Sequence, residues 1–187
     1  MSLAREVRRL ALPAIGTSLL QTAVFLIDRI MLGRHGPTDL AAIQIAGSVE
    51  WSVFSLMSAF TIGTLARVGM AKGAGDREGA RKAIAVSIVT ALALGSTLAL
   101  ATFPVLALVP KIFPNASAET IEGARGYLQA TMLASPAMLL ATTVTAAMQG
   151  SGDTRTPFVV GIVTLVLHVA LNRLFILGGL GVPALGV

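Results

Sequence analysis

The segment LALPAIGTSLLQTAVFLIDRIML, residues 10–32, is an apolar run of 23 residues that carries two adjacent charges, Asp28 and Arg29, near its end. A helix needs about 20 apolar residues to cross a bilayer, so this run is long enough to span one. It is also longer than the apolar core of a secretory signal peptide, and no A-x-A cleavage motif follows it. We therefore expect the segment to stay in the protein as a membrane helix.

The rest of the sequence has the same character. Of the 187 residues, 55% are hydrophobic and only 12% are charged, which is about half the charged share of a soluble domain. The sequence predicts an all-α polytopic membrane protein, a single transmembrane domain over residues 1–187. Its five apolar runs predict five transmembrane helices at about 10–32, 41–71, 83–109, 126–148 and 158–177.

The basic residues predict the orientation of these helices. Lys and Arg collect on the cytoplasmic side of membrane proteins. The N-terminal segment and the second and fourth connections carry eight of them between them, whereas the other side has three, Arg34, Lys111 and Arg125. We therefore expect a cytoplasmic N-terminus and a multi-pass protein of the inner or plasma membrane. The net charge of +5 reflects this bias, and it gives no reason to expect a nucleic-acid partner.

Polar side chains inside the spans are expensive in lipid and therefore mark candidate functional positions. At a rise of about 1.5 Å per residue, Asp28 lies about 27 Å from the cytoplasmic face, and His168 and Asn172 lie about 17 and 23 Å from it. His168 and Asn172 are four residues apart and share a helix face. A carboxylate, an imidazole and an amide at comparable depth predict a proton or cation site, because histidine titrates near physiological pH.

Structural roles explain these residues equally well. Asp28 and Arg29 could simply reach the outer interface, and His168 could make a hydrogen bond that only packs helices. Arg67 and Arg173 lie near helix ends and fit interfacial anchors, while Glu50 lies near the start of the second span and is expected to face water. The sequence has no cysteine and no nucleophile–base pair or metal-ligand cluster within the spans. We therefore expect neither an enzyme nor a metal site.

Five segments in order resemble the N-terminal lobe of the multidrug and toxic compound extrusion (MATE) transporters. The loop MQGSGDTRTP is the most specific match. The segments are residues 10–36, 63–82, 126–140, 148–157 and 168–187. The last of them is similar to the end of the fifth helix and the start of a sixth.

The resemblance implies export of cationic or amphipathic compounds, coupled to inward flow of H⁺ or Na⁺, with no cofactor beyond that ion. Asp28 matches the first-helix aspartate implicated in cation coupling. His168 and Asn172 match fifth-helix positions where family members often have Asn and Asp. Pro13 matches the proline at which the first helix is proposed to bend. Arg29 is then expected to turn toward the outer interface.

Family members have two six-helix lobes around a cavity that opens alternately to each side. This sequence stops near the start of the sixth helix, so we expect a fragment of a longer protein, or a truncated product, whose partner is the missing C-terminal lobe. Two alternatives stay open: a lipid-linked oligosaccharide flippase of the same superfamily, and a membrane half-lobe that does not transport.

Overall fold

The computed structural model describes residues 3–176 and 178, and the helices within these residues account for almost all of them. In chain order the helices are α1 (Leu3–His35), α2 (Pro37–Gly73), α3 (Arg77–Leu100), α4 (Thr102–Ile112), α5 (Ala118–Leu133), α6 (Ser135–Gly150) and α7 (Arg155–Ile176).

The described helices match the expected membrane architecture. Four of them, α1, α2, α3 and α7, are long and apolar enough to cross a bilayer, and α5 and α6, bent by 52° where they meet, make a fifth if the pair is one span. This confirms an all-α polytopic membrane protein. The expected start of a sixth helix falls on residues 179–187, outside the described residues, as does the end of the fifth apolar run at residue 177.

Two apolar runs that the sequence presents as single spans are broken helices. The run at 83–109 is divided between α3 and α4, and the run at 126–148 contains the bend between α5 and α6. Proline explains both breaks because it lacks a backbone N–H and cannot continue the hydrogen-bond ladder. Pro104 lies in the first turn of α4, and Pro136 lies in the first turn of α6.

The helices α3 and α7 begin before their apolar runs, in polar connections where a side-chain oxygen accepts a bond from the first turn. Asp76 Oδ1 accepts a hydrogen bond from Gly79 N (2.8 Å) at the start of α3. Asp153 Oδ1 accepts one from Thr156 N (3.0 Å) in the first turn of α7. Such caps satisfy backbone donors that a helix leaves unpaired at its N-terminus. The bond from Thr156 lowers the pKa of Asp153, because it favours the ionised carboxylate.

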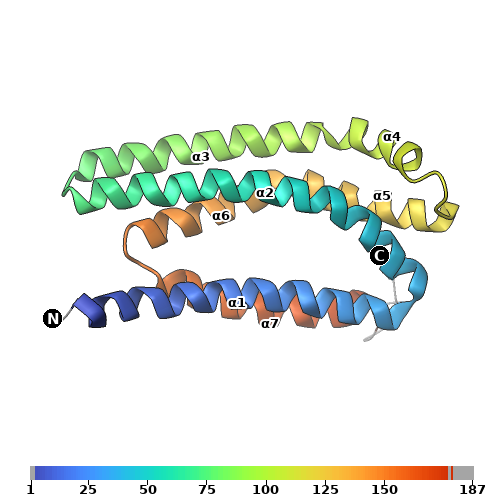
Figure 1. Ribbon diagram of the computed structural model, residues 1–187, viewed down its shortest axis with the longest axis horizontal. Coiled ribbons are helices and arrows are strands. Elements are labelled where there is room, and N and C mark those ends of the chain that lie inside the picture. The colour runs from blue at the N-terminus through green and yellow to red at the C-terminus, as the bar shows by residue number, and fades with distance from the viewer. Residues whose placement is uncertain (1–2, 177, 179–187) are drawn as a thin grey trace.

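The helices form two layers. Figure 1 shows α1 and α7 side by side in one layer, and α2, α3 and α6 in the other. Small residues allow close packing within each layer. A Cβ on Gly16 of α1 would lie 2.5 Å from the Phe158 ring of α7, and one on Gly95 of α3 would lie 2.5 Å from Pro136 Cα of α6. A side chain at Gly95 would meet backbone atoms of α6 and force that helix to shift, whereas one at Gly16 would require the Phe158 side chain to move.

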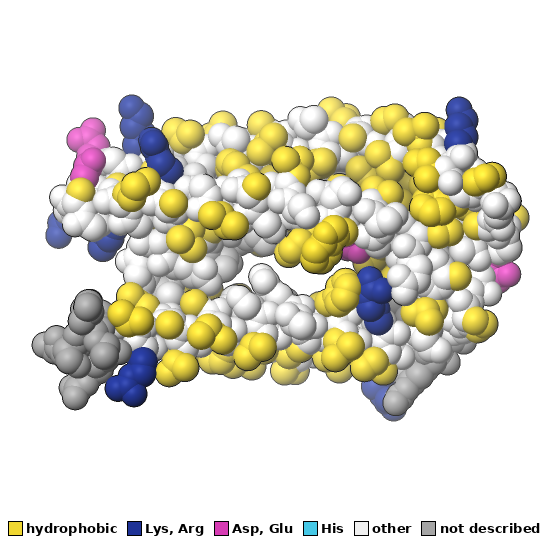
Figure 2. All heavy atoms as spheres, in the orientation of Figure 1, with side chains coloured by type: hydrophobic (Ala, Val, Ile, Leu, Met, Phe, Trp, Pro, Cys, Tyr) yellow, Lys and Arg dark blue, Asp and Glu magenta, His cyan; other side chains and the backbone are white. Residues whose placement is uncertain are grey.

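The connections divide between the two ends of the molecule. The N-terminus, the α2–α3 turn and the α6–α7 loop lie at one end, and the α1–α2 turn and the α4–α5 connection lie at the other (Figure 1). In Figure 2, Lys and Arg side chains gather at the first of these ends, although several also lie toward the second. The first end is the one that the sequence analysis expects to be cytoplasmic.

Candidate functional site

The structure brings together the three polar residues that the sequence analysis singled out by depth. Asp28 lies on α1, and His168 and Asn172 lie one turn apart on α7. His168 Nε2 is 2.6 Å from Asp28 Oδ1, and Asn172 Nδ2 donates to the same oxygen at 2.5 Å. Asn172 Nδ2 also lies 3.1 Å from His168 Nε2. The three polar groups therefore form one cluster, here called the Asp28 cluster.

The geometry of the Asp28 cluster allows the Asp28 carboxylate and the His168 imidazole to share one proton. At 2.6 Å, either an imidazole N–H donates to the carboxylate or a carboxyl O–H donates to the imidazole nitrogen. Asn172 remains a donor to Asp28 Oδ1 and so stabilises the ionised carboxylate. The side chains of His168 and Asp28 are 31% and 29% exposed. The cluster is thus partly desolvated but still open to a proton or a small cation.

Pro13 lies in the opposite half of α1 from the Asp28 cluster. α1 runs from Leu3 to His35 with Pro13 inside it. Proline cannot donate to the carbonyl four residues before it, which leaves a weak point in the ladder. Thr17 Oγ1 donates back to Pro13 O (3.0 Å) and reinforces the following turn. The proposed bend therefore remains a prediction.

Arg29 differs from its expected position because it packs against α2 instead of turning outward. Its guanidinium carbon lies 4.1 Å from the centre of the Phe25 ring, a cation–π distance. A Cβ on Gly47 of α2 would lie 3.4 Å from an Arg29 guanidinium nitrogen. Within the described residues, Arg29 Nε is buried without a hydrogen-bond partner. Arg29 is therefore a contact between α1 and α2 beside the Asp28 cluster.

The sequence analysis missed a second polar pair, formed by Glu50 and Tyr127. Tyr127 Oη on α5 lies 3.2 and 3.3 Å from the two carboxylate oxygens of Glu50 on α2. Glu50 is half-buried, so the expectation that it faces water is wrong. Tyr127 is the one tyrosine in the sequence, and a single phenol inside an apolar run is the signal that could have drawn attention to it. The pair gives the lobe a second carboxylate in addition to Asp28.

The layer of α1 and α7 is separated from the layer of α2 and α6 over part of its length. Figure 2 shows an opening between these two layers, bordered by an acidic and a basic side chain. The α1–α2 turn joins the layers at one end and the α6–α7 loop joins them at the other (Figure 1).

The two predicted anchors, Arg67 and Arg173, are both exposed near helix ends.

Comparisons with known proteins agree with this architecture. The MatE family model matches residues 13–174. The probable multidrug resistance protein NorM of Thermotoga maritima is 31% identical over 98% of this chain and 39% of its own length. The multidrug resistance protein PmpM of Pseudomonas aeruginosa is 32% identical over 97% of this chain and 38% of its own. The chain thus spans about two fifths of the length of these curated relatives.

Solved structures show the same fold. The chain superposes on an outward-facing conformation of a multidrug resistance MATE family transporter of the MOP superfamily with a TM-score of 0.85 and 24% sequence identity, covering 91% of this chain and 38% of that one. Together with five possible membrane spans and the family match over residues 13–174, this shows that the chain is a multi-pass membrane protein belonging to the MatE family.

Proposed function

We propose that this chain is the N-terminal part of a cation-coupled antiporter that exports cationic or amphipathic compounds by alternating access. The relatives are named as multidrug resistance proteins and not as enzymes, which supports transport over catalysis. The observation that carries the proposal is the Asp28 cluster, where a carboxylate on α1 contacts an imidazole and an amide on α7.

In this mechanism Asp28 takes up H⁺ or Na⁺ from the outer side and releases it on the cytoplasmic side. The cluster can hold either ion, because the carboxylate oxygens of Asp28 bind hard cations and the 2.6 Å contact with His168 can hold a proton. Protonation removes the charge that orients Asn172 and His168. The contact between α1 and α7 then weakens, and α1 rearranges about Pro13, which displaces the exported compound.

Glu50 and Tyr127 lie outside this primary step. Glu50 is half-buried on α2 and accepts a hydrogen bond from the Tyr127 hydroxyl. In its ionised form it offers a secondary attraction for cations. Glu50 is also a second carboxylate besides Asp28. The fifth-helix positions carry His168 and Asn172 and therefore provide none.

Ethidium accumulation tests the proposal in cells that lack their own efflux pumps. The complete transporter is expressed as wild type or as Asp28→Asn at matched membrane levels. We expect low accumulation in wild-type cells and high accumulation in the mutant. Equal accumulation in wild-type, mutant and empty cells would refute drug export and leave the flippase and the half-lobe that does not transport as the explanations to test.

The control is Glu78→Gln, which removes an exposed acid in the first turn of α3, at the opposite end of the molecule from the α1–α2 turn (Figure 1). It changes the net charge by the same amount. If it abolishes export as completely as Asp28→Asn, loss of charge alone explains the effect and the assigned role of Asp28 fails.

A further inference from the structure

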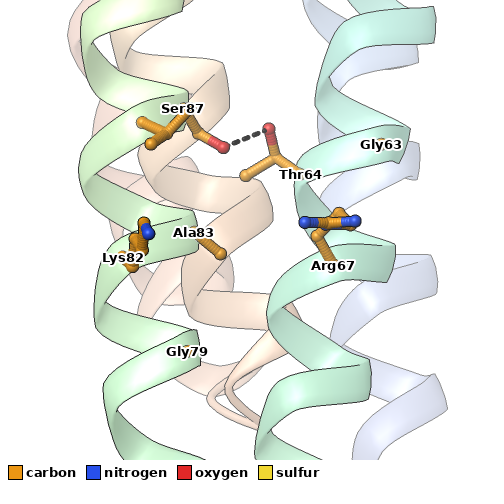
Figure 3. A pocket seen from close by; sticks show the side chains of 8 residues that line it. Gly63, Thr64, Arg67, Gly79, Lys82, Ala83 and Ser87 are labelled. Carbon is orange, nitrogen blue, oxygen red and sulfur yellow. Dashed lines mark hydrogen bonds between the residues drawn. The ribbon is translucent and has the colours of Figure 1, made fainter.

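A basic pocket lies between α2 and α3, close to the α2–α3 turn and apart from the Asp28 cluster. Its volume is about 340 Å³. Figure 3 shows Arg67 on α2 and Lys82 on α3 on opposite sides of the groove, with Thr64 and Ser87 about one turn further along the helices. The proposed export mechanism gives this pocket no role.

The interfacial role expected for Arg67 does not explain why a second cation, Lys82, lines the same pocket. Arg67 and Lys82 come from different helices and are both exposed, and like charges that flank one pocket repel each other. Asp76 lies at the rim beside Arg67, but its carboxylate already accepts the capping bond from Gly79 N at 2.8 Å. An anion bound between Arg67 and Lys82 would relieve the repulsion and gain charge-assisted hydrogen bonds.

The floor of the pocket adds a neutral donor. Thr64 is 2% exposed, and its Oγ1 donates to Ser87 Oγ at 3.1 Å (Figure 3). When Thr64 donates to Ser87 and not to Phe60 O, which lies 3.4 Å from Thr64 Oγ1, the hydrogen of Ser87 can be donated into the pocket. A guanidinium, an ammonium and a hydroxyl then converge on one volume. All three are donors, and a phosphate group consists of acceptor oxygens.

The depth of the pocket in the bilayer indicates which kind of phosphate compound could reach it. Arg67 is six residues from the end of α2 and Lys82 five from the start of α3, so they lie about 9 and 8 Å inside the helix ends. The polar layer of a bilayer is about 5–8 Å thick on each side. Val86 lines the pocket. It and Val89, one turn further along α3, are 57% and 67% exposed. An apolar strip therefore continues from the pocket toward the middle of the membrane.

We propose that this pocket binds the phosphate of an anionic glycerophospholipid, such as phosphatidylglycerol, from the cytoplasmic leaflet, with an acyl chain lying along Val86 and Val89. Basic pockets between transmembrane helices on the cytoplasmic side bind anionic head groups in this way. The occupied pocket would join α2 to α3 and would hold the α2 layer in place while α1 moves.

Native mass spectrometry of the purified full protein, titrated with phosphatidylglycerol or phosphatidylcholine, tests the proposal. The Arg67→Gln/Lys82→Gln variant should bind phosphatidylglycerol about 30-fold more weakly than wild type, because each cation near the membrane surface contributes a factor of about five. The Arg8→Gln/Arg9→Gln variant has the same change in charge at the same end of the molecule and should bind like wild type. Phosphatidylcholine should bind weakly to all three proteins.

Each other outcome counts against the proposal. Equal losses in the two double variants would show attraction to total charge and no pocket. Inorganic phosphate or glycerol 3-phosphate that binds as tightly as the lipid would show a soluble anion site. If the double variant loses helix content, Lys82→Gln alone replaces it, with an expected loss of about fivefold, and unchanged lipid binding in that variant would overturn the assignment.

Discussion

Asn172→Leu should reduce ethidium export by weakening the contact between α1 and α7. Asn172 Nδ2 on α7 donates to Asp28 Oδ1 on α1 at 2.5 Å, and leucine fills much of the same space but cannot donate. A hydrogen bond to a charged group contributes about 1.5–3 kcal/mol. Its loss leaves His168 as the remaining partner of this oxygen within the described residues.

The loss of this bond corresponds to a weakening of the cluster by about 10- to 150-fold. The lower end applies here, because the Asp28 side chain is 29% exposed and water can replace part of the lost bond. We therefore expect ethidium export by the complete transporter to fall about tenfold at matched expression. Thr164→Val is the control, since Thr164 is exposed on α7 one turn before His168. Export by Asn172→Leu at the level of wild type and of Thr164→Val would refute the reasoning.

Three further predictions concern the helix packing, a helix cap and the second polar pair. Gly95→Ala should destabilise the protein by about 1–3 kcal/mol in thermal unfolding, because its Cβ would meet backbone atoms of α6 at 2.5 Å. Gly126→Ala, with nothing within 4 Å, should be neutral or stabilising, and equal effects of the two would contradict the packing. The stabilising contribution of Asp153, whose pKa is lowered in the folded protein, should be present above its ordinary value of 3.8 and be lost as pH falls below it. Asp153→Asn should therefore reduce the pH dependence of the unfolding temperature at acid pH, and an unaltered pH profile would count against the cap. Tyr127→Phe should weaken export of cationic compounds less than Glu50→Gln does, because it leaves the charge in place, and the reverse order would contradict the assigned attraction.

The membrane spans were predictable because a bilayer imposes length and hydropathy on each helix. The length and hydropathy of residues 10–32 predict a span without information from any other segment. The break at Ala134 between α5 and α6 was not predictable in the same way. Pro136 signals a disturbed hydrogen-bond ladder, but the size of the bend depends on how α6 packs against α3 at Gly95.

The Asp28 cluster was predictable from depth, and the Glu50–Tyr127 pair was not. Helices that cross one bilayer run roughly parallel to each other. Residue counts from a common membrane face therefore give the depths of Asp28 and His168 on one scale. Depth does not say which helices are neighbours. Glu50 and Tyr127 are 77 residues apart, and only the packing of α2 against α5 brings them together. A position near the start of an apolar run also suggested solvent for Glu50, whereas Tyr127 on α5 contacts it.

The central claim is that Asp28 couples ion movement to export. Its most direct test uses the complete transporter in proteoliposomes loaded with dyes sensitive to H⁺ and to Na⁺. Ethidium is added on one side, and ion movement is followed as the compound crosses. The account predicts counterflow of one of these ions in wild type and none in Asp28→Asn, with the mutant still folded. Counterflow in Asp28→Asn at the wild-type rate would contradict the account and place the coupling site elsewhere in the transporter.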